Sequence, residues 1–287
     1  MIYLLLSIFF NTILFVIIKL FAKFNIDALQ ALVVNYFVAF LVGVFFLEDN
    51  ARQSIDLFSQ DWFKGSIILG FIFISTFYVT TITSQKNGLS VASVASKMSV
   101  IIPIALGVLL YNESLQIINI FGILLAIIAV YFTSKKETGQ IQKTSNLLFP
   151  ALVFLGAGTI DSSLKYIQTY YIRENQIGLF STITFFCAFC VGVLIIAFFR
   201  IQGKIKFSGR TILGGIALGL PNYFSLYYMV KMLEAKPFES ATLFTIHNIS
   251  IVLLSTFIGI IFFSEKISLR NAIGIGMALL ALYLVTL

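Results

Sequence analysis

Three ionisable side chains lie within apolar stretches, where they are the strongest candidates to bind a charged substrate. Lys97 lies in SVASVASKMSVIIPIALGVLL, Asp161 in LGAGTIDSSLKY, and His247 in SATLFTIHNIS. A charged side chain at the centre of a bilayer costs at least about 2.5 to 3.5 kcal/mol, so it needs a partner, water or a ligand. We expect these residues to line a polar chamber and to contact the charged groups of a zwitterionic or anionic metabolite. The alternative is a fixed structural pair, Asp161 with Lys165 or Lys97, that joins helices and never touches substrate.

Two further polar residues extend this predicted site. Lys165 lies four residues after Asp161, so both project from one face of a helix. Asn11 lies at mid-depth of the first apolar run. The single histidine, His247, would suit a proton-coupled step because an unperturbed histidine titrates near a pH of about 6.5. The adjacent Asn248 equally suits a hydrogen-bonded structural histidine, so a proton or a counter-substrate is left open as the coupling partner.

Aromatic and amide residues that follow Pro221 form a second candidate surface. Asn222 and Tyr223 come directly after this proline, and Tyr227 lies one turn further on. Tyr78 occupies the position that corresponds to Tyr227 in the first half of the chain, which is related to the second half by the internal repeat described below. Proline removes a backbone donor, so nearby carbonyls can face a cavity and a substrate. The alternative is ordinary packing, with the polar groups hydrogen-bonded across helices.

Two prolines predict hinges, and two glutamates predict structural contacts. Pro103 lies six residues after Lys97 and would loosen the turn at Ser99, whose carbonyl loses its usual donor. Pro221 is the second predicted hinge. Glu113 and Glu265 end related segments, and we expect each to cap the helix that follows it or to pair with a cation in a loop.

The residue set argues against a metal site and against an intramembrane enzyme. One histidine and two cysteines leave no ligand set, and Cys187 and Cys190 on an apolar helix are typical of buried thiols. An enzyme would need a nucleophile with a base or paired acids, whereas Asp161 is the single carboxylate that the sequence places clearly at mid-span. We therefore expect no cofactor, no metal and no catalytic residue.

The composition predicts an all-α integral membrane protein. Hydrophobic residues make up 59% of the 287 residues and charged residues 11%, whereas a soluble chain carries about 25% charged residues. Most Lys and Arg lie between apolar runs, so the net charge of +7 indicates topology signals and lipid headgroup contacts, not nucleic acid. We expect ten membrane-spanning helices, at about 2–22, 29–47, 63–84, 90–111, 115–133, 147–170, 177–199, 210–232, 240–262 and 268–286.

Matching residues indicate that the chain is an internal repeat. Adding 152 to a position carries Gly107 to Gly259 and Glu113 to Glu265, among other identities. We expect a first five-helix repeat at 1–133, a connecting loop at 134–146 and a second five-helix repeat at 147–287. Because five is odd, the second repeat would enter the membrane inverted.

The most specific motifs are PIALGVLLYNESLQIINIFGILLAIIAVY and its partner STFIGIIFFSEKISLRNAIGIGMALLALY. Together with the five-plus-five pattern, they resemble the EamA-like branch of the drug/metabolite transporter superfamily. The resemblance implies a secondary transporter, often an exporter of amino acids, other metabolites or drugs, with a central cavity between the halves. It also implies cytoplasmic termini, whereas the loop distribution of Lys and Arg favours external termini.

We therefore predict a multi-pass transporter of the cytoplasmic membrane that moves a small metabolite by alternating access. The excess of cations in the predicted site favours an amino acid or a related carboxylate, and the resemblance favours export. A multidrug or cationic-compound exporter is the alternative transport function, and a non-transporting receptor or scaffold is the alternative from another class. The sequence leaves the oligomeric state open.

Overall fold

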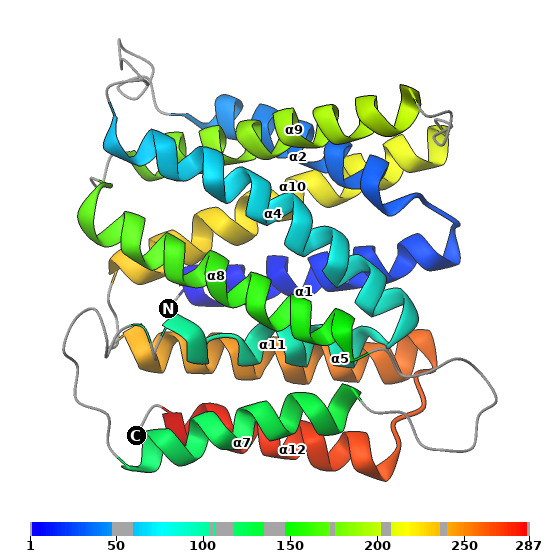
Figure 1. Cartoon of the computed structure of the whole chain (residues 1–287), viewed down its shortest axis with the longest axis vertical. Coiled ribbons are helices and arrows are strands. Elements are labelled where there is room, and N and C mark those ends of the chain that lie inside the picture. The colour runs from blue at the N-terminus through cyan, green and yellow to red at the C-terminus, as the bar shows by residue number, and fades with distance from the viewer. Residues whose placement is uncertain are drawn as a thin grey trace. The chain divides into compact units, whose positions relative to one another are not determined.

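The computed structural model describes residues 2–47, 60–103, 106, 117–134, 147–172, 176–201, 208–235 and 240–285. Within these ranges every long element is an α-helix, which confirms the predicted all-α class with ten helices. The helices are α1 (Ile2–Lys23), α2 (Ala28–Phe46), α4 (Asp61–Lys86), α5 (Leu89–Met98), α7 (Ile117–Ser134), α8 (Leu148–Tyr170), α9 (Ile177–Ile201), α10 (Gly209–Ala235), α11 (Ser240–Phe263) and α12 (Leu269–Val285) (Figure 1).

Several of these helices are long and apolar enough to cross a membrane. Among the described residues, the criteria of length and composition are met by α1, α2, α4, residues 177–199 of α9 and residues 246–263 of α11. The expected fourth span, 90–111, is shorter as an unbroken helix, because α5 ends at Met98. The far end of that span and Glu113 lie outside the described residues.

The chain divides into two compact units that do not follow the predicted repeats. Unit 1 comprises residues 1–78 and 163–237, and unit 2 comprises residues 79–162 and 238–287. Each unit therefore takes helices from both halves of the sequence. The repeat boundaries and their inversion stay a prediction.

Unit 1 is built around α10, which packs against α1, α2 and α9. Two glycines one turn apart on α10 let it approach α2 closely, as a G-x-x-x-G face does. A Cβ at Gly215 would lie 2.5 Å from the Cβ of Val34, and one at Gly219 would lie 2.9 Å from the carbonyl oxygen of Asn35. Any larger side chain here would push the two helices apart.

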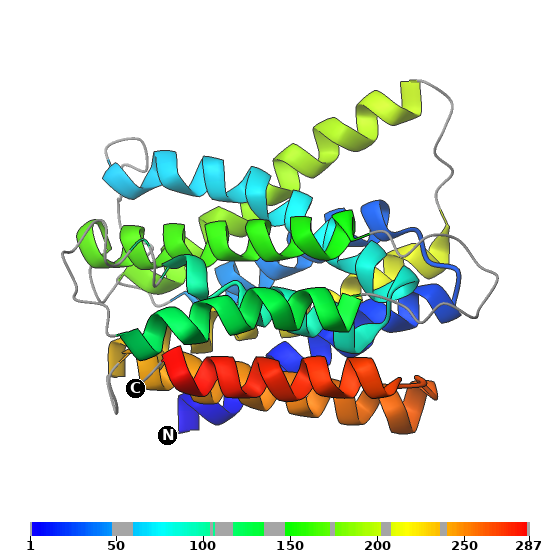
Figure 2. The same cartoon turned by 60° about the horizontal axis from the view of Figure 1, so that its bottom comes forward.

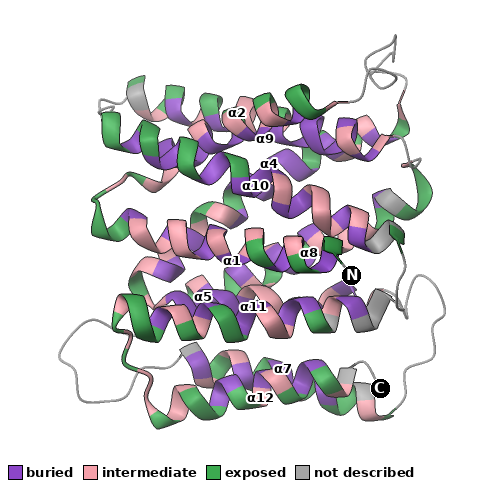
Figure 3. Ribbon diagram, turned by 180° about the vertical axis from the view of Figure 1, so that it is seen from behind, coloured by how far each residue is buried: buried purple, intermediate pink, exposed green. Residues whose placement is uncertain are grey.

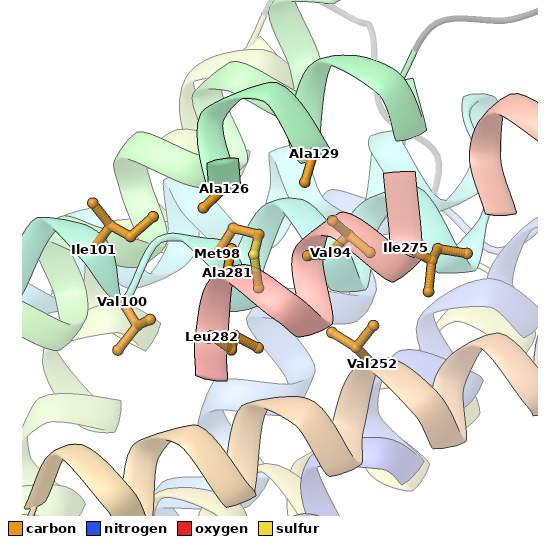
Figure 4. Close-up of a cluster of buried hydrophobic side chains, with 11 residues drawn as sticks. Val94, Met98, Val100, Ile101, Ala126, Ala129, Val252, Ile275, Ala281 and Leu282 are labelled. Carbon is orange, nitrogen blue, oxygen red and sulfur yellow. The ribbon is translucent and has the colours of Figure 1, made fainter. Parts of the chain in front are cut away.

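Unit 2 contains a close pair, α7 and α12, which run side by side in both views (Figures 1 and 2). Alanines on the facing sides of this pair are buried, and α5 packs against both helices. Figure 4 shows the resulting apolar cluster around Met98, directly beside Lys97 in the sequence. Its buried members are Val94, Met98, Val100, Ile101, Ala126, Ala129, Val252, Ile275, Ala278, Ala281 and Leu282.

Large apolar side chains are also exposed along the outer faces of α7 and α12, where exposed residues recur in Figure 3. Phe121, Leu124 and Leu280 are each more than half exposed. Soluble proteins rarely expose contiguous apolar faces of this kind. Contact with lipid explains them.

Candidate substrate site

Lys97 lies in the last turn of α5, a helix of small and apolar residues whose other described members are almost all buried. The lysine itself is half-buried. An ammonium group near the C-terminal end of a helix is stabilised by the helix dipole. Lys97 therefore lies in apolar surroundings, and part of its side chain remains accessible.

The helix breaks directly after Lys97. A turn at Ser99 and Val100 separates α5 from the helical residues 101–103. Pro103 has no N–H to donate to the carbonyl of Ser99. The Ser99 carbonyl therefore loses its usual donor, and the N–H of Ile102 donates to it instead, at 2.9 Å. The loosened turn itself lies where Pro103 predicts it.

Asp161 lies on α8 in the same unit, and its charge interacts with that of Lys97. One turn earlier on α8, Gly158 packs against the segment that follows Lys97. A Cβ at Gly158 would lie 2.8 Å from the Cβ of Ile102. The segment of α8 that carries Asp161 thus contacts the segment that follows Lys97, and the Asp161 side chain is also half-buried.

His247 lies on α11, which packs against α5 within unit 2. Its side chain is 1% exposed, and its Nδ1 lies 3.3 Å from Oδ1 of the adjacent Asn248. The positive charge of Lys97 also acts on the imidazole. Unit 2 thus brings together the three ionisable residues that the sequence singled out, from α5, α8 and α11.

The residues predicted after Pro221 lie in unit 1 and have interhelical partners. Nδ2 of Asn222 donates to Oδ1 of Asn35 on α2 at 3.1 Å, and both side chains are buried. The hydroxyl of Tyr223 is hydrogen-bonded to that of Thr182 on α9. This arrangement favours the packing alternative for Asn222 and Tyr223.

Asn35 was missed by sequence reasoning. It lies in an apolar run with no charged neighbour and no special spacing. The G-x-x-x-G face of α10 could have pointed to Asn35. Such a face predicts close contact with another helix, and amides in the middle of two closely packed helices can hydrogen-bond to each other.

The other predicted residues of unit 1 are more accessible. Tyr227 is half-buried and stacks on Tyr223, with ring centroids 5.9 Å apart. Asn11 on α1 and Lys165 on α8 are half-buried, and Tyr78 on α4 is 38% exposed. The helix α10 continues without a break through Pro221, so the two predicted hinges differ in structure.

Glu265 contacts a different helix from the one expected. The N-terminus of α12 is capped by Ser268, whose Oγ accepts a hydrogen bond from the N–H of Asn271 at 3.2 Å. The Glu265 carboxylate instead accepts hydrogen bonds from Leu89 and Ser90 at the start of α5. The prediction that Glu265 caps the helix that follows it is wrong.

Metal coordination finds no support in the part of the chain that the structure describes. No group of three or more His, Cys, Asp or Glu side chains there could hold an ion.

Residues 1–135 match the sequence model of the EamA-like transporter family, which belongs to the drug/metabolite transporter superfamily. This segment is an EamA-like transporter domain. The match confirms the family that the two half-motifs resemble. Together with the apolar helices, the match indicates a multi-pass membrane protein, whose first 135 residues are of the EamA-like transporter type.

Two further similarities cover almost the whole chain. An uncharacterised protein of Haemophilus influenzae (strain ATCC 51907 / DSM 11121 / KW20 / Rd) is 26% identical over 274 residues, which are 93% of this chain and 91% of the relative. A protein of known crystal structure is 13% identical, with a TM-score of 0.61 over 98% of both chains. The second similarity shows that the fold of this chain, over nearly its whole length, also occurs in that protein.

Proposed function

We propose that this EamA-like protein is a secondary transporter that exports an amino acid or a related carboxylate across the cytoplasmic membrane by alternating access. The observation that carries the proposal is that Lys97 and Asp161 lie in one compact unit, where Gly158 of α8 packs against Ile102, five residues after Lys97. Both side chains are half-buried, so part of each remains accessible to a ligand.

A zwitterion suits this pair better than any singly charged compound. The substrate carboxylate would bind the Lys97 ammonium, and the substrate ammonium would bind the Asp161 carboxylate. Charge-assisted hydrogen bonds of this kind are about twice as strong as neutral ones. When the site is empty, the two side chains neutralise each other, so the carrier can reorient without an unpaired charge in the membrane.

The remaining predicted residues have supporting roles in this proposal. Within unit 2, His247 would contact a polar group of the substrate. Asn11, Lys165, Tyr78 and Tyr227 lie in unit 1, so their contact with substrate stays a prediction from the sequence. Asn222 and Tyr223 hold α10 to α2 and α9 and reach the substrate only indirectly.

The break after Met98 would let the end of α5 move as access alternates. Pro103 keeps that turn from closing into a regular helix, because it cannot supply the missing hydrogen bond. Pro221 would let α10 bend at that position, because a proline inside a helix removes one backbone hydrogen bond while the helix stays continuous. Such motion near the site is what a rocking transporter needs.

A cationic substrate is the second candidate, and one observation favours it. Aromatic rings of α1 and α10 form a stacked row in unit 1, and aromatic faces attract organic cations. Phe10 stacks on Phe224 and on Tyr228, with centroids 5.3 and 5.9 Å apart, and Tyr3 stacks on Tyr228 at 6.2 Å. Lys97 opposes a cation unless Asp161 neutralises it.

Flux through liposomes that contain the purified protein tests the function directly. Three labelled probes separate the substrate classes: leucine as a zwitterion, succinate as a dianion and tetraphenylphosphonium as a cation. The proposal predicts saturable uptake and counterflow of leucine. Uptake of tetraphenylphosphonium alone would favour the second candidate, and no saturable flux over a wide panel would contradict transport of these classes.

A further inference from the structure

The N-terminus of α5 cannot be capped in the usual way. The preceding residue, Gly88, has φ 116° and ψ 158° and makes no side-chain cap. This backbone region is open essentially to glycine alone. The Ser, Thr, Asp or Asn that normally caps a helix is therefore excluded at this position, and the free N–H groups need an acceptor from elsewhere.

Glu265 supplies that acceptor from a segment 175 residues away in the sequence. Its Oε1 accepts a hydrogen bond from the N–H of Leu89 at 2.7 Å. Its Oε2 accepts from the N–H of Ser90 at 3.4 Å and from the Ser90 hydroxyl at 3.2 Å. A carboxylate at this end of a helix is also stabilised by the helix dipole.

The carboxylate is itself held in place. Ser264 has a positive φ of 50°, and the N–H of Glu265 donates to the carbonyl of Gly259 at 3.0 Å. A Cβ at Gly259 would lie 2.9 Å from Oε2 of Glu265, so glycine leaves the room that the carboxylate occupies. One side chain thus fastens the end of α11 to the start of α5.

This contact bears on the site because Lys97 and His247 lie on the two helices that it joins. Lys97 is eight residues after Leu89, or about 12 Å along the helix axis. The other end of α5 has no continuous helix to hold it, since the turn at Ser99 and Val100 follows. The cap therefore adds a fixed point at the start of a helix that packing against α7, α11 and α12 also holds.

We infer that Glu265 is a positioning residue for Lys97: by capping α5 from the end of α11, it fixes where the Lys97 ammonium meets substrate. The inference rests on the proposed transport function and extends it to a residue outside the apolar spans. Glu265 needs no contact with the substrate for this role. Its loss should change substrate affinity through Lys97.

The test compares Glu265→Ala and Glu265→Gln with a neighbouring control, Lys266→Gln, in purified full-length protein. Hydrogen exchange of a peptide that spans residues 89–92 reports the cap, and the concentration dependence of flux reports the site. We expect Glu265→Ala to raise the exchange rate of these amides about tenfold. We also expect the half-saturation concentration to rise at least about threefold at equal folded yield. Glu265→Gln, which keeps one acceptor oxygen, should fall between Glu265→Ala and the wild type, and Lys266→Gln should match the wild type.

Two results would overturn the inference while leaving the transport function intact. One is unchanged exchange in Glu265→Ala, which would show that the carboxylate does not hold α5. The other is faster exchange with unchanged half-saturation, which would make the cap purely structural. If Glu265→Ala fails to fold, hydrogen exchange and half-saturation are compared between the wild type and the variants Glu265→Gln and Ser90→Ala instead. If wild-type protein gives no saturable flux, the proposed function fails first and the positioning role fails with it.

Discussion

Two pairs of polar side chains, one in each compact unit, are held in opposite ways. In unit 1, Asn222 and Tyr223 are neutral, 1% exposed and hydrogen-bonded to residues of neighbouring helices. In unit 2, Lys97 and Asp161 are charged and only half-buried, although each interacts with the other. Neutral groups can be buried completely once they have partners, whereas the desolvation cost of burying an ion pair can exceed the attraction between its charges. The half-buried charges of unit 2 are therefore the groups left able to exchange partners with a substrate.

The two prolines sharpen the same contrast. In unit 2, α5 ends shortly before Pro103, and a turn at Ser99 and Val100 separates the two. In unit 1, α10 runs through Pro221 without a break and keeps its close contact with α2. The unit that carries the charges also carries the interrupted helix, which is the combination that a moving binding site requires.

The largest effect should come from removing one charge of the unit 2 pair. Lys97→Ala takes away the group that binds the substrate carboxylate and leaves Asp161 without its counter-charge. Breaking a fully buried pair costs about 3 to 5 kcal/mol, and this half-buried pair should cost less, so we expect saturable flux to fall by at least about tenfold. Flux at matched folded yield measures this, with the exposed Lys64→Ala as control. A decrease of less than about threefold would contradict the role of Lys97.

The next largest effect should come from the glycine face of unit 1. Gly219→Leu forces a side chain against α2, where even a Cβ would lie 2.5 Å from the Cβ of Val38. Overpacking typically costs about 1 to 3 kcal/mol, so we expect a lower midpoint of thermal unfolding and a lower folded yield. The matched control is Gly276→Leu on α12, where an added Cβ meets no atom within 4 Å. Equal unfolding midpoints for the two variants would show that the close contact of α10 and α2 is not needed.

A smaller effect should separate the two prolines. Pro103→Ala restores a backbone donor for the Ser99 carbonyl and favours a continuous helix. If the turn must move, the maximal rate of flux should fall about fivefold with little change in half-saturation. Pro221→Ala, in a helix that is already continuous, should change the rate less. Equal rates in both variants and the wild type would remove the hinge from the mechanism.

The smallest effect should come from the amide pair of unit 1. A double-mutant cycle of Asn35→Ala and Asn222→Ala, read by chemical unfolding, should give a coupling free energy of about 0.6 kcal/mol, as is usual for hydrogen bonds between membrane helices. The substrate half-saturation concentration should not change in the single variants. A large rise in half-saturation for Asn222→Ala would move this residue from the packing of unit 1 into the substrate site.

The sequence predicted the helices well because each apolar run is a local property of the chain. It also singled out Lys97, Asp161 and His247 as candidate site residues, since an ionisable residue in an apolar run can be recognised from the sequence without knowing its partner. The structure places all three in unit 2. Contacts between helices were harder to predict. Spacing within a helix says nothing about which distant segment it meets, so the pairs Asn35 with Asn222 and Glu265 with Ser90 needed coordinates. The conformation of Gly88, which excludes a local cap, is likewise not written in the residue type alone.

The most direct test of the central claim is the flux of labelled leucine in the double variant Lys97→Met with Asp161→Leu. Replacing both charges removes the cost of an unpaired ion, so the variant should fold as well as the wild type or better. If the pair binds substrate, the double variant should show no saturable flux and no counterflow despite its folded yield. Flux at the wild-type rate would show instead that Lys97 and Asp161 form a fixed structural pair.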